Sequence, residues 1–361
     1  MMAERKMGVL IHGAGWVSTQ HIAAFRANPH TEVVAISSRT LASAHKRAEE
    51  AHLDVACYDD YAAALQHEGV DIVSVCTPQH VHADNVIAAA QAGKHIAIEK
   101  PMAMTLDEIA GMHDAISAAA VKTVVSFVLR WNPMFCNAKA LIADGAIGEI
   151  YAVETDYQSY LADWWSGYAD GRRASTGGSA MLVGGCHAID AMRWFAGSGE
   201  FGPANAVEVF AYAGGKRKGA VEQYNYYTHE WHDGAPLEYD GLEMALVRFD
   251  NGVLGKVSVN FECIQPYTFP IRVFGDKGTI RDNRLYSHRH GAEWQEIPGV
   301  CPDSSDVTHH PFQAQMDHFV ECIQGGVESH CNFADAIQTH EIALAAQECY
   351  RTGRPVKLPL I

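Results

Sequence analysis

Apolar and polar positions follow two different patterns along this chain, and the change of pattern divides it into two parts. Over the first 125 residues, short apolar runs alternate with Ala-rich stretches in which apolar residues recur at helical spacing. Strands separated by helices need right-handed parallel crossovers, so residues 1–125 are expected to form a doubly wound Rossmann sheet. The predicted strands are 8–12, 32–38, 71–76, 95–99 and 123–128, and the predicted helices are 19–27, 41–51, 60–67, 81–92 and 106–119.

The pattern changes after Gly148. A strand-like alternation at 149–157 is followed by an aromatic and basic loop at 161–176 and a helical stretch at 178–195. Between 204 and 297, short runs are separated by turn sequences such as Asp-Asn-Gly at 250–252, which are typical of hairpins. Helices are expected at 311–324 and 333–351. Residues 126–361 therefore predict a second α/β domain with an open, largely antiparallel sheet.

Composition narrows the class of protein. Hydrophobic residues make up 48% of the chain and charged residues 19%, which is an ordinary globular balance. A net charge of −16 repels phosphate backbones and anionic lipid, so neither nucleic acid nor a membrane surface is an expected partner. The apolar run near the N-terminus is too brief for a secretory signal, and no run is long enough to span a membrane. A cytoplasmic protein is expected.

Cysteine and histidine give no metal or disulfide framework. The nine cysteines are scattered without a Cys-x-x-Cys pair, so most are expected to be buried apolar residues. The chain has 20 histidines, and three pairs have spacings that a metal could use: His229/His232, His288/His290 and His309/His310. Because no third ligand stands at a diagnostic offset from them, no metal is expected.

A glycine-rich turn follows the first predicted strand and opens the first helix. It reads Gly13-Ala14-Gly15-Trp16-Val17-Ser18, with serine where a third glycine or alanine is usual. Glycines allow a sharp turn and bring backbone N–H groups against a pyrophosphate at the positive end of the helix dipole. The motif predicts dinucleotide binding through Gly13, Gly15, Trp16 and Val17.

The end of the second strand indicates which dinucleotide is bound. An NAD site usually has Asp or Glu there for the ribose 2′-hydroxyl, but this chain has Ser38 and Arg39. A hydroxyl and a guanidinium match a 2′-phosphate, which favours NADP(H). NAD(H) stays open, because Arg39 could instead stack on the adenine.

Two further segments carry a family resemblance. The chain contains Cys76-Thr77-Pro78 with His82, then Gly93-Lys94-His95, then Glu99-Lys100-Pro101; later, Gly177-Gly178-Ser179 leads into Gly184-Gly185-Cys186-His187-Ala188-Ile189-Asp190. In these segments, and along nearly its whole length, the sequence resembles the Gfo/Idh/MocA family of sugar and cyclitol dehydrogenases. The resemblance implies reversible interconversion of a secondary alcohol and a ketone on a sugar, sugar derivative or inositol, by NADP(H) or NAD(H). It also implies that the second domain binds substrate and forms a homodimer or homotetramer.

The catalytic residues follow from the same segments. Lys100 stands where the fifth strand ends, so its ammonium is expected to hydrogen-bond the reacting substrate oxygen and to stabilise its developing charge. His187 is a candidate acid/base, with Asp190 one helical turn later to orient its imidazole. The family's acidic residue would fall at Val183, which cannot transfer a proton. The resemblance adds further cofactor contacts at Thr77, Pro78, His82, Glu99 and Lys100.

Aromatic residues and two alternative functions complete the prediction. Tyr157 and Trp165 are candidate substrate-binding residues together with Lys100 and His187, because flat rings pack on the C–H faces of sugars. An aromatic core strip or a subunit contact explains these rings equally well. One alternative function is a cofactor-retaining enzyme that cleaves glycosides by transient oxidation. The other is a dinucleotide-sensing regulator without catalysis, which would not need Lys100 and His187 together.

Overall fold

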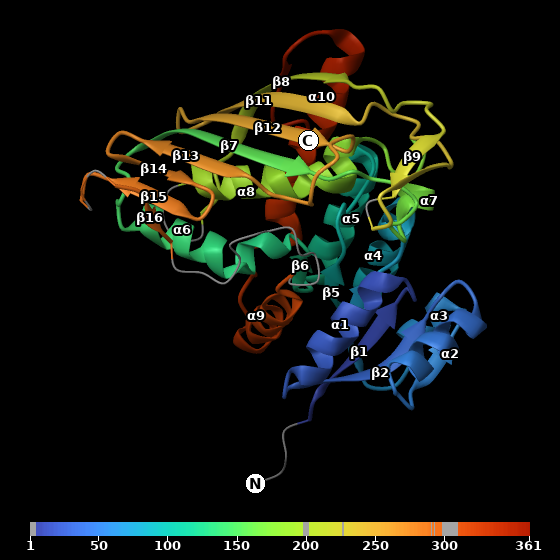
Figure 1. Ribbon diagram of the computed structural model, residues 1–361. Coiled ribbons are helices and arrows are strands. Elements are labelled where there is room, and N and C mark those ends of the chain that lie inside the picture. The colour runs from blue at the N-terminus through green and yellow to red at the C-terminus, as the bar shows by residue number, and fades with distance from the viewer. Residues whose placement is uncertain (1–4, 198–201, 226, 290, 292, 298–309) are drawn as a thin grey trace. The chain divides into compact units, whose positions relative to one another are not determined.

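The computed structural model describes residues 5–197, 202–225, 227–289, 291, 293–297 and 310–361. The chain forms two compact units (Figure 1). The first consists of Met1–Ser126 and Pro311–Asp335, and the second of Phe127–His310 and Ala336–Ile361. This division differs from the predicted 1–125 and 126–361, because a segment near the C-terminus belongs to the first unit.

The first unit is a Rossmann fold, as predicted. Its six strands are all parallel and lie in the order β3-β2-β1-β4-β5-β6. The elements are β1 Met7–His12, α1 Trp16–Ala27, β2 Thr31–Ser37, α2 Leu41–Glu50, β3 Ala56–Tyr58, α3 Tyr61–Leu65, β4 Val70–Val75, η1 Gln79–Val81, α4 His82–Gln91, β5 His95–Ile98, α5 Leu106–Ala119 and β6 Thr123–Val125. The order of the strands reverses between β1 and β4, the place where such sheets bind dinucleotides.

Helix α9 (Phe312–Gly325) is the segment that joins the first unit. It packs against α1, and the two helices run side by side in Figure 1. Gln315 donates a hydrogen bond from Nε2 to the Val125 carbonyl of β6 at 3.2 Å, and Asn28 at the end of α1 donates to Asp317 at 2.6 Å. The packing on α1 and these long-range hydrogen bonds both connect α9 to the first unit.

The second unit contains a nine-stranded mixed sheet in the order β16-β15-β14-β13-β7-β12-β11-β8-β17. Only the β7–β12 pair is parallel among the described strand pairs of this sheet, which confirms the largely antiparallel prediction. Its strands are β7 Ile150–Gln158, β8 Ala206–Gly214, β11 Leu242–Phe249, β12 Leu254–Asn260, β13 Ile271–Gly275, β14 Gly278–Arg281, β15 Arg284–Ser287, β16 Gln295–Glu296 and β17 Val356–Lys357; a separate hairpin joins β9 Glu222–Asn225 to β10 Glu230–Asp233.

Among its described residues, the second unit also contains six helical segments, of which α8 and η3 pack against strands β7 and β12 of this sheet. They are η2 Val128–Trp131, α6 Pro133–Ala143, α7 Tyr168–Gly171, η3 Met181–Gly185, α8 Cys186–Ala196 and α10 Phe333–Thr352, of which α10 begins in the first unit. Helix α8 lies along β7 and β12 (Figure 1), and every one of its residues is buried. A helix buried on all sides is a core element and not a surface one.

The other face of the sheet exposes apolar side chains. Strand β11 alternates strictly, with Ala245, Val247 and Phe249 buried and Met244 and Leu246 exposed. Residues directly opposite one another in a sheet share a face. The exposed row continues on the neighbouring strands at Tyr212, which pairs with Met244, and at Leu254, which pairs with Arg248.

Candidate active site

The glycine turn of the first unit has the form that a dinucleotide needs. Gly13 has φ +112°, and a Cβ there would lie 2.6 Å from the carbonyl carbon and oxygen of Cys76. Gly15 precedes α1 without a side-chain cap, and a Cβ on it would meet nothing within 4 Å. The space beside Gly15 at the N-terminus of α1 is therefore open, which fits the approach of a dinucleotide pyrophosphate.

Two polar side chains hold this turn from the protein side. Ser18, at the third position of the motif, is buried and donates its hydroxyl to the Gly15 carbonyl at 2.7 Å, which explains how the turn accepts serine. Arg47 of α2 donates from Nη2 to the carbonyls of Ala14 at 3.0 Å and Gly15 at 3.3 Å. Sequence reasoning missed Arg47, because no motif points to it.

The end of β2 presents Ser38 and Arg39 as predicted. Arg39 is exposed, and the next residue, Thr40, caps α2 by accepting a hydrogen bond from the Ser43 N–H at 3.2 Å. Arg39 therefore lies next to the N-terminus of α2, where the helix dipole also favours a bound anion.

A buried histidine, His12, connects the end of β1 to the end of β2, next to Ser38. His12 bonds through Nδ1 to the Ser37 hydroxyl at 2.7 Å and stacks on Tyr61 at 3.7 Å between ring centroids. Burial lowers the pKa of His12 to about 4, so its imidazole is neutral near pH 7.

His82 brings the ends of β4 and β5 together. Its two ring nitrogens lie 2.8 Å from the Thr77 carbonyl oxygen and 2.9 Å from the Pro101 carbonyl oxygen. The first carbonyl belongs to the turn after β4, and the second follows Lys100 after β5. The two sequence segments that carry the family resemblance in this unit are therefore linked directly through one imidazole.

Glu99 faces the protein interior. Its Oε1 lies 3.0 Å from Nε2 of His21, a residue of α1, and its Oε2 accepts a hydrogen bond from the Lys100 N–H at 3.2 Å. The other nitrogen of His21 lies 2.7 Å from the Ser74 hydroxyl of β4. Sequence reasoning missed His21, which is a lone histidine in an otherwise ordinary helix.

In the second unit, the predicted helix at 178–195 starts with a π turn. The turn η3 contains Val183, and α8 proper contains His187, Asp190 and Trp194. Because a π turn bonds residue i to i+5, the predicted helical face does not extend with regular spacing back to Val183. The carboxylate of buried Glu243 accepts the N–H groups of Ala180 at 3.0 Å and Met181 at 2.9 Å and so caps this segment.

His187 lies in an aromatic cluster. Its ring centroid is 6.0 Å from that of Phe269, 6.1 Å from His310 and 6.2 Å from Phe127. None of these three neighbours was predicted, because they come from separate loops and turns that no motif connects.

Tyr157 reaches the same cluster. Its ring lies 5.0 Å from Phe269, and its hydroxyl is hydrogen-bonded to that of Tyr267. A Cβ at Gly184, three residues before His187, would lie 2.9 Å from the Tyr157 ring, so a glycine at this position leaves space for the phenol. Burial raises the pKa of Tyr157, so its phenol is neutral and can donate a hydrogen bond.

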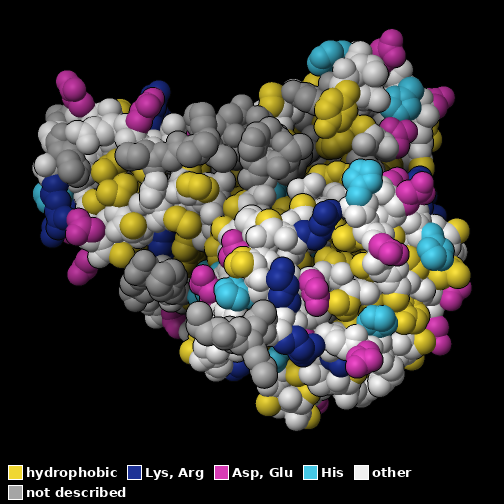
Figure 2. All heavy atoms as spheres, turned by 90° about the horizontal axis from the view of Figure 1, so that it is seen from below, with side chains coloured by type: hydrophobic (Ala, Val, Ile, Leu, Met, Phe, Trp, Pro, Cys, Tyr) yellow, Lys and Arg dark blue, Asp and Glu magenta, His cyan; other side chains and the backbone are white. Residues whose placement is uncertain are grey.

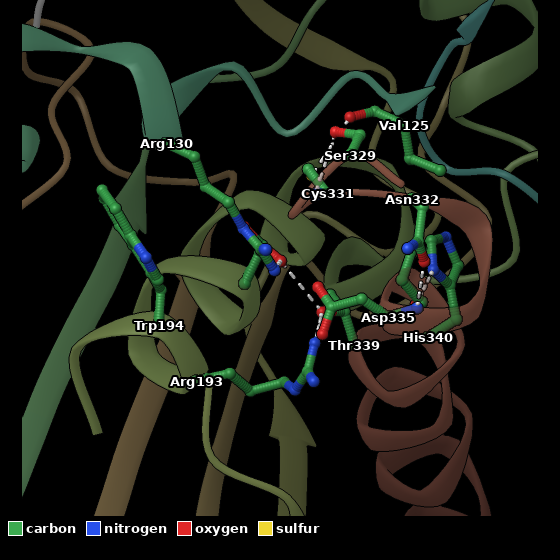
Figure 3. A network of polar contacts seen from close by, with 12 residues as sticks. Val125, Arg130, Arg193, Trp194, Ser329, Cys331, Asn332, Asp335, Thr339 and His340 are labelled. Atoms are coloured by element: carbon green, nitrogen blue, oxygen red, sulfur yellow. Dashed lines mark hydrogen bonds and ion pairs between the residues drawn. The ribbon is translucent and has the colours of Figure 1, made fainter. Parts of the chain in front are cut away.

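Asp190 is part of a buried ion pair. Its carboxylate accepts hydrogen bonds from Arg130 Nε at 2.8 Å and Nη2 at 2.6 Å, and from the Thr339 hydroxyl at 3.1 Å. Arg193 donates to Thr339 at 2.7 Å, and Figure 3 shows Arg130 and Arg193 pointing into this network from different elements. We predicted that Asp190 would orient His187, but its two carboxylate oxygens instead accept hydrogen bonds from two nitrogens of the Arg130 guanidinium.

The aromatic loop of the second unit divides into separate groups. The Trp165 ring is folded over its own loop, where a Cβ at Gly167 would lie 2.4 Å from it. Tyr160 stacks with Arg217 at 4.1 Å and accepts the Tyr224 N–H of β9 at 3.1 Å. Tyr160, just before the predicted loop, thus supports the β9–β10 hairpin.

Histidine pairs and surface charge complete the description. His229 bonds to Tyr224 and His232 to Asp163, whereas His290 and His309 lie outside the described residues. Within the described ranges, no three or more His, Cys, Asp or Glu side chains are grouped as metal ligands would be. Acidic, basic and histidine side chains are interspersed on the face shown in Figure 2. No described helix is long and apolar enough to cross a membrane.

Comparison with known proteins identifies the class. Residues 7–127 match the oxidoreductase family with an NAD-binding Rossmann fold, and residues 135–281 match the GFO/IDH/MocA C-terminal domain. Together with the glycine turn, these matches define an NAD(P)-dependent oxidoreductase. The chain belongs to the Gfo/Idh/MocA family, which confirms the resemblance seen in its sequence.

Several relatives are similar over almost the whole chain. D-xylose 1-dehydrogenase (NADP(+)) 2 of Haloferax volcanii is 36% identical over 344 residues, covering 93% of this chain and 95% of that protein. scyllo-Inositol 2-dehydrogenase (NAD(+)) of Bacillus subtilis is 26% identical over 339 residues, covering 91% and 90%. A solved structure of levoglucosan dehydrogenase with NADH and L-sorbose has a TM-score of 0.84 at 23% identity, covering 99% of this chain and 100% of that one. The last comparison shows a shared fold.

Proposed function

We propose that this protein interconverts a secondary alcohol and a ketone on a sugar, sugar derivative or inositol. The observation that carries the proposal is the link through His82 between the turn after β4 and the Glu99-Lys100 strand end, on the sheet whose β1–α1 turn fits a dinucleotide. The similarity to dehydrogenases named for xylose and scyllo-inositol supports the substrate class.

The chain's residues divide the chemistry between them. The nicotinamide, when bound, accepts or returns the hydride. Lys100 hydrogen-bonds the substrate oxygen and stabilises the charge that develops on it as the C–H bond breaks. His187 takes the hydroxyl proton, since an imidazole nitrogen can accept a proton and the side chain of Val183 cannot. Asp190 contributes indirectly: its ion pair with Arg130 fixes the position of α8, the helix that carries His187.

Substrate and cofactor contacts are assigned to the remaining predicted residues. Tyr157 donates a hydrogen bond to a sugar oxygen from its neutral phenol, and Trp165 offers a flat face to the ring. Gly13, Gly15, Trp16 and Val17 seat the pyrophosphate, while Thr77 and Pro78 line the turn that His82 holds. Ser38 and Arg39 favour NADP(H), a preference that the name of the Haloferax relative supports.

The exposed apolar face of the nine-stranded sheet supports an oligomer. Tyr212, Met244, Leu246 and Leu254 place apolar side chains on neighbouring strands of one face. Contiguous apolar surface of this kind usually marks an interface. A second copy of the chain is the proposed partner, in a homodimer or homotetramer that sedimentation analysis would identify. Cytoplasmic location and the lack of nucleic-acid or membrane partners stay predictions.

Turnover by Lys100→Met tests the function. The wild type is first screened against polyols and glycosides by absorbance of the reduced nicotinamide. With the best substrate, the variant should lose about 10²–10³ in kcat, the usual cost of removing one transition-state hydrogen-bond donor. Dinucleotide affinity should change less than a few-fold.

Lys94→Met is the matched control. This lysine precedes the other end of β5 and donates to the Val70 carbonyl at 2.9 Å, so its loss should leave kcat unchanged. Equal kcat in Lys100→Met and wild type would contradict the assignment. Product release without net reduced nicotinamide would favour the glycoside-cleaving alternative.

A further inference from the structure

The first unit contains a buried pair of titratable groups that the proposed chemistry does not use. The His21 side chain is fully buried and that of Glu99 is 9% exposed, and the two lie 3.0 Å apart. Phe312 of α9 packs on the His21 ring at 5.2 Å between centroids and closes this site from the helix side. Burying two ionisable groups together costs desolvation energy, so such a pair is weak evidence for stability alone.

The interaction between the two side chains favours the charged form of each. Burial by itself lowers the pKa of His21, but interactions with Cys76 and Glu99 outweigh it and raise the value to about 10. Burial would raise the pKa of Glu99, yet its bond to His21 and the charges of His21 and Lys100 bring it below its usual range. An imidazolium donates from both nitrogens, which suits the Ser74 hydroxyl on one side and the carboxylate on the other.

The pair connects two functional segments of the fold. His21 is on α1, the helix that starts at the glycine turn, and Glu99 immediately precedes Lys100. Oxygen Oε1 of Glu99 is held by His21, while Oε2 holds the Lys100 N–H at 3.2 Å. The carboxylate is thus fixed at one end by a helix and fixes the lysine backbone at the other.

We propose that His21 is a positioning residue for Lys100, acting through the carboxylate of Glu99. The proposal rests on the function proposed above for Lys100. Lysine has four rotatable side-chain bonds, so the direction of its ammonium depends on a fixed backbone at its root. Misplacing a reacting group by about 1 Å can cost on the order of 10²-fold in rate.

The test compares His21→Gln and Glu99→Gln with a control on the same strand. The amides keep hydrogen bonds but remove the charges. His95→Gln is the control, because His95 begins β5 at its opposite end and accepts the Lys122 N–H at 3.0 Å. We expect kcat to fall roughly 10–100-fold in the first two variants. In His21→Gln, which replaces no predicted cofactor contact, the KM for substrate and the dinucleotide Kd should stay within about three-fold of wild type. The control should match wild type in all three.

A double variant separates positioning from general damage. In a Lys100→Met background, His21→Gln should lower the residual kcat by less than about two-fold, because residues that act as a unit are non-additive. If His21→Gln lowers kcat in the Lys100→Met background as much as it does in the wild type, the proposal is overturned.

A second readout does not depend on turnover. Lysines are reductively methylated with a ¹³C label, and the Lys100 signal is assigned by its loss in Lys100→Arg. We expect this signal to shift or broaden in His21→Gln and to stay in place in His95→Gln. An unmoved Lys100 signal in His21→Gln would refute the positioning role, even with an enzyme whose substrate is still unknown. Failure of the wild type to oxidise any polyol would count against the proposed function instead.

Discussion

Replacing Asp190 by asparagine should strongly destabilise the second unit. The Arg130 and Asp190 side chains are 0% and 1% exposed, and two guanidinium nitrogens hold the carboxylate. Asparagine keeps the shape but leaves the Arg130 charge buried without its counter-charge. Breaking one partner of a buried pair costs about 3–5 kcal/mol. In a unit of this size, that loss lowers the thermal midpoint by roughly 6–20 °C.

The assay is urea denaturation followed by circular dichroism and tryptophan emission. Arg272→Gln is the matched control, because Arg272 of β13 pairs with Glu154 of β7 at 2.9 Å while the two side chains are 52% and 32% exposed. Exposed pairs contribute about 0–1 kcal/mol, so the control should denature almost as the wild type does. If Asp190→Asn lowers the free energy of unfolding by no more than Arg272→Gln does, the buried ion pair does not stabilise the packing of α8.

Three further outcomes are expected. Gly13→Ala should abolish detectable dinucleotide binding in a fluorescence titration, because its Cβ would lie 2.6 Å from the Cys76 carbonyl at φ +112°; near-normal affinity would contradict the close approach. Arg39→Asp should weaken NADP(H) at least ten-fold more than NAD(H) in parallel titrations, since a carboxylate repels a 2′-phosphate, and a wild type that already prefers NAD(H) would refute the reasoning. The difference in unfolding free energy between wild type and His21→Gln should shrink as pH rises from 6.5 to 10. Burial lowers the pKa of His21 in the folded protein, but the interactions with Cys76 and Glu99 outweigh burial and raise it to about 10. The folded protein therefore releases this proton at a higher pH than the unfolded chain does, and the stabilisation is lost over that range. Denaturation curves at several pH values check this sign, and a difference that grows with pH would contradict it.

Local patterns were sufficient for most of the fold. The β1 and α5 regions were predicted to within one residue, because a buried strand and a Thr-capped amphipathic helix each carry their own signal. Strand β3 has three half-buried residues and was missed, since so short a segment has no period. Helix α6 was missed as well, although Asn132 and Pro133 form a recognisable helix start.

The sites depended more on tertiary contacts. Lys100 and the glycine turn could be predicted as site residues because strand ends and helix starts have fixed directions in a parallel sheet. The partner of Asp190 was not, because Arg130 is distant in the sequence and the nearer His187 satisfied the helical spacing equally well. Tyr267 and His310 were also missed, since only the folded chain brings those loop residues to the His187 cluster.

The complete burial of α8 has a consequence for altering substrate preference by directed evolution. Every position from Cys186 to Ala196 packs against protein, so libraries that randomise this helix would mostly yield insoluble variants. The loop that follows β7 has half-buried and exposed positions, including Asp163, Trp164 and Ser166, where substitutions disturb the core less than in α8. Given the substrate contact proposed above for Trp165 in this loop, a campaign that fixes α8 and diversifies the loop is expected to change sugar preference while keeping the scaffold folded.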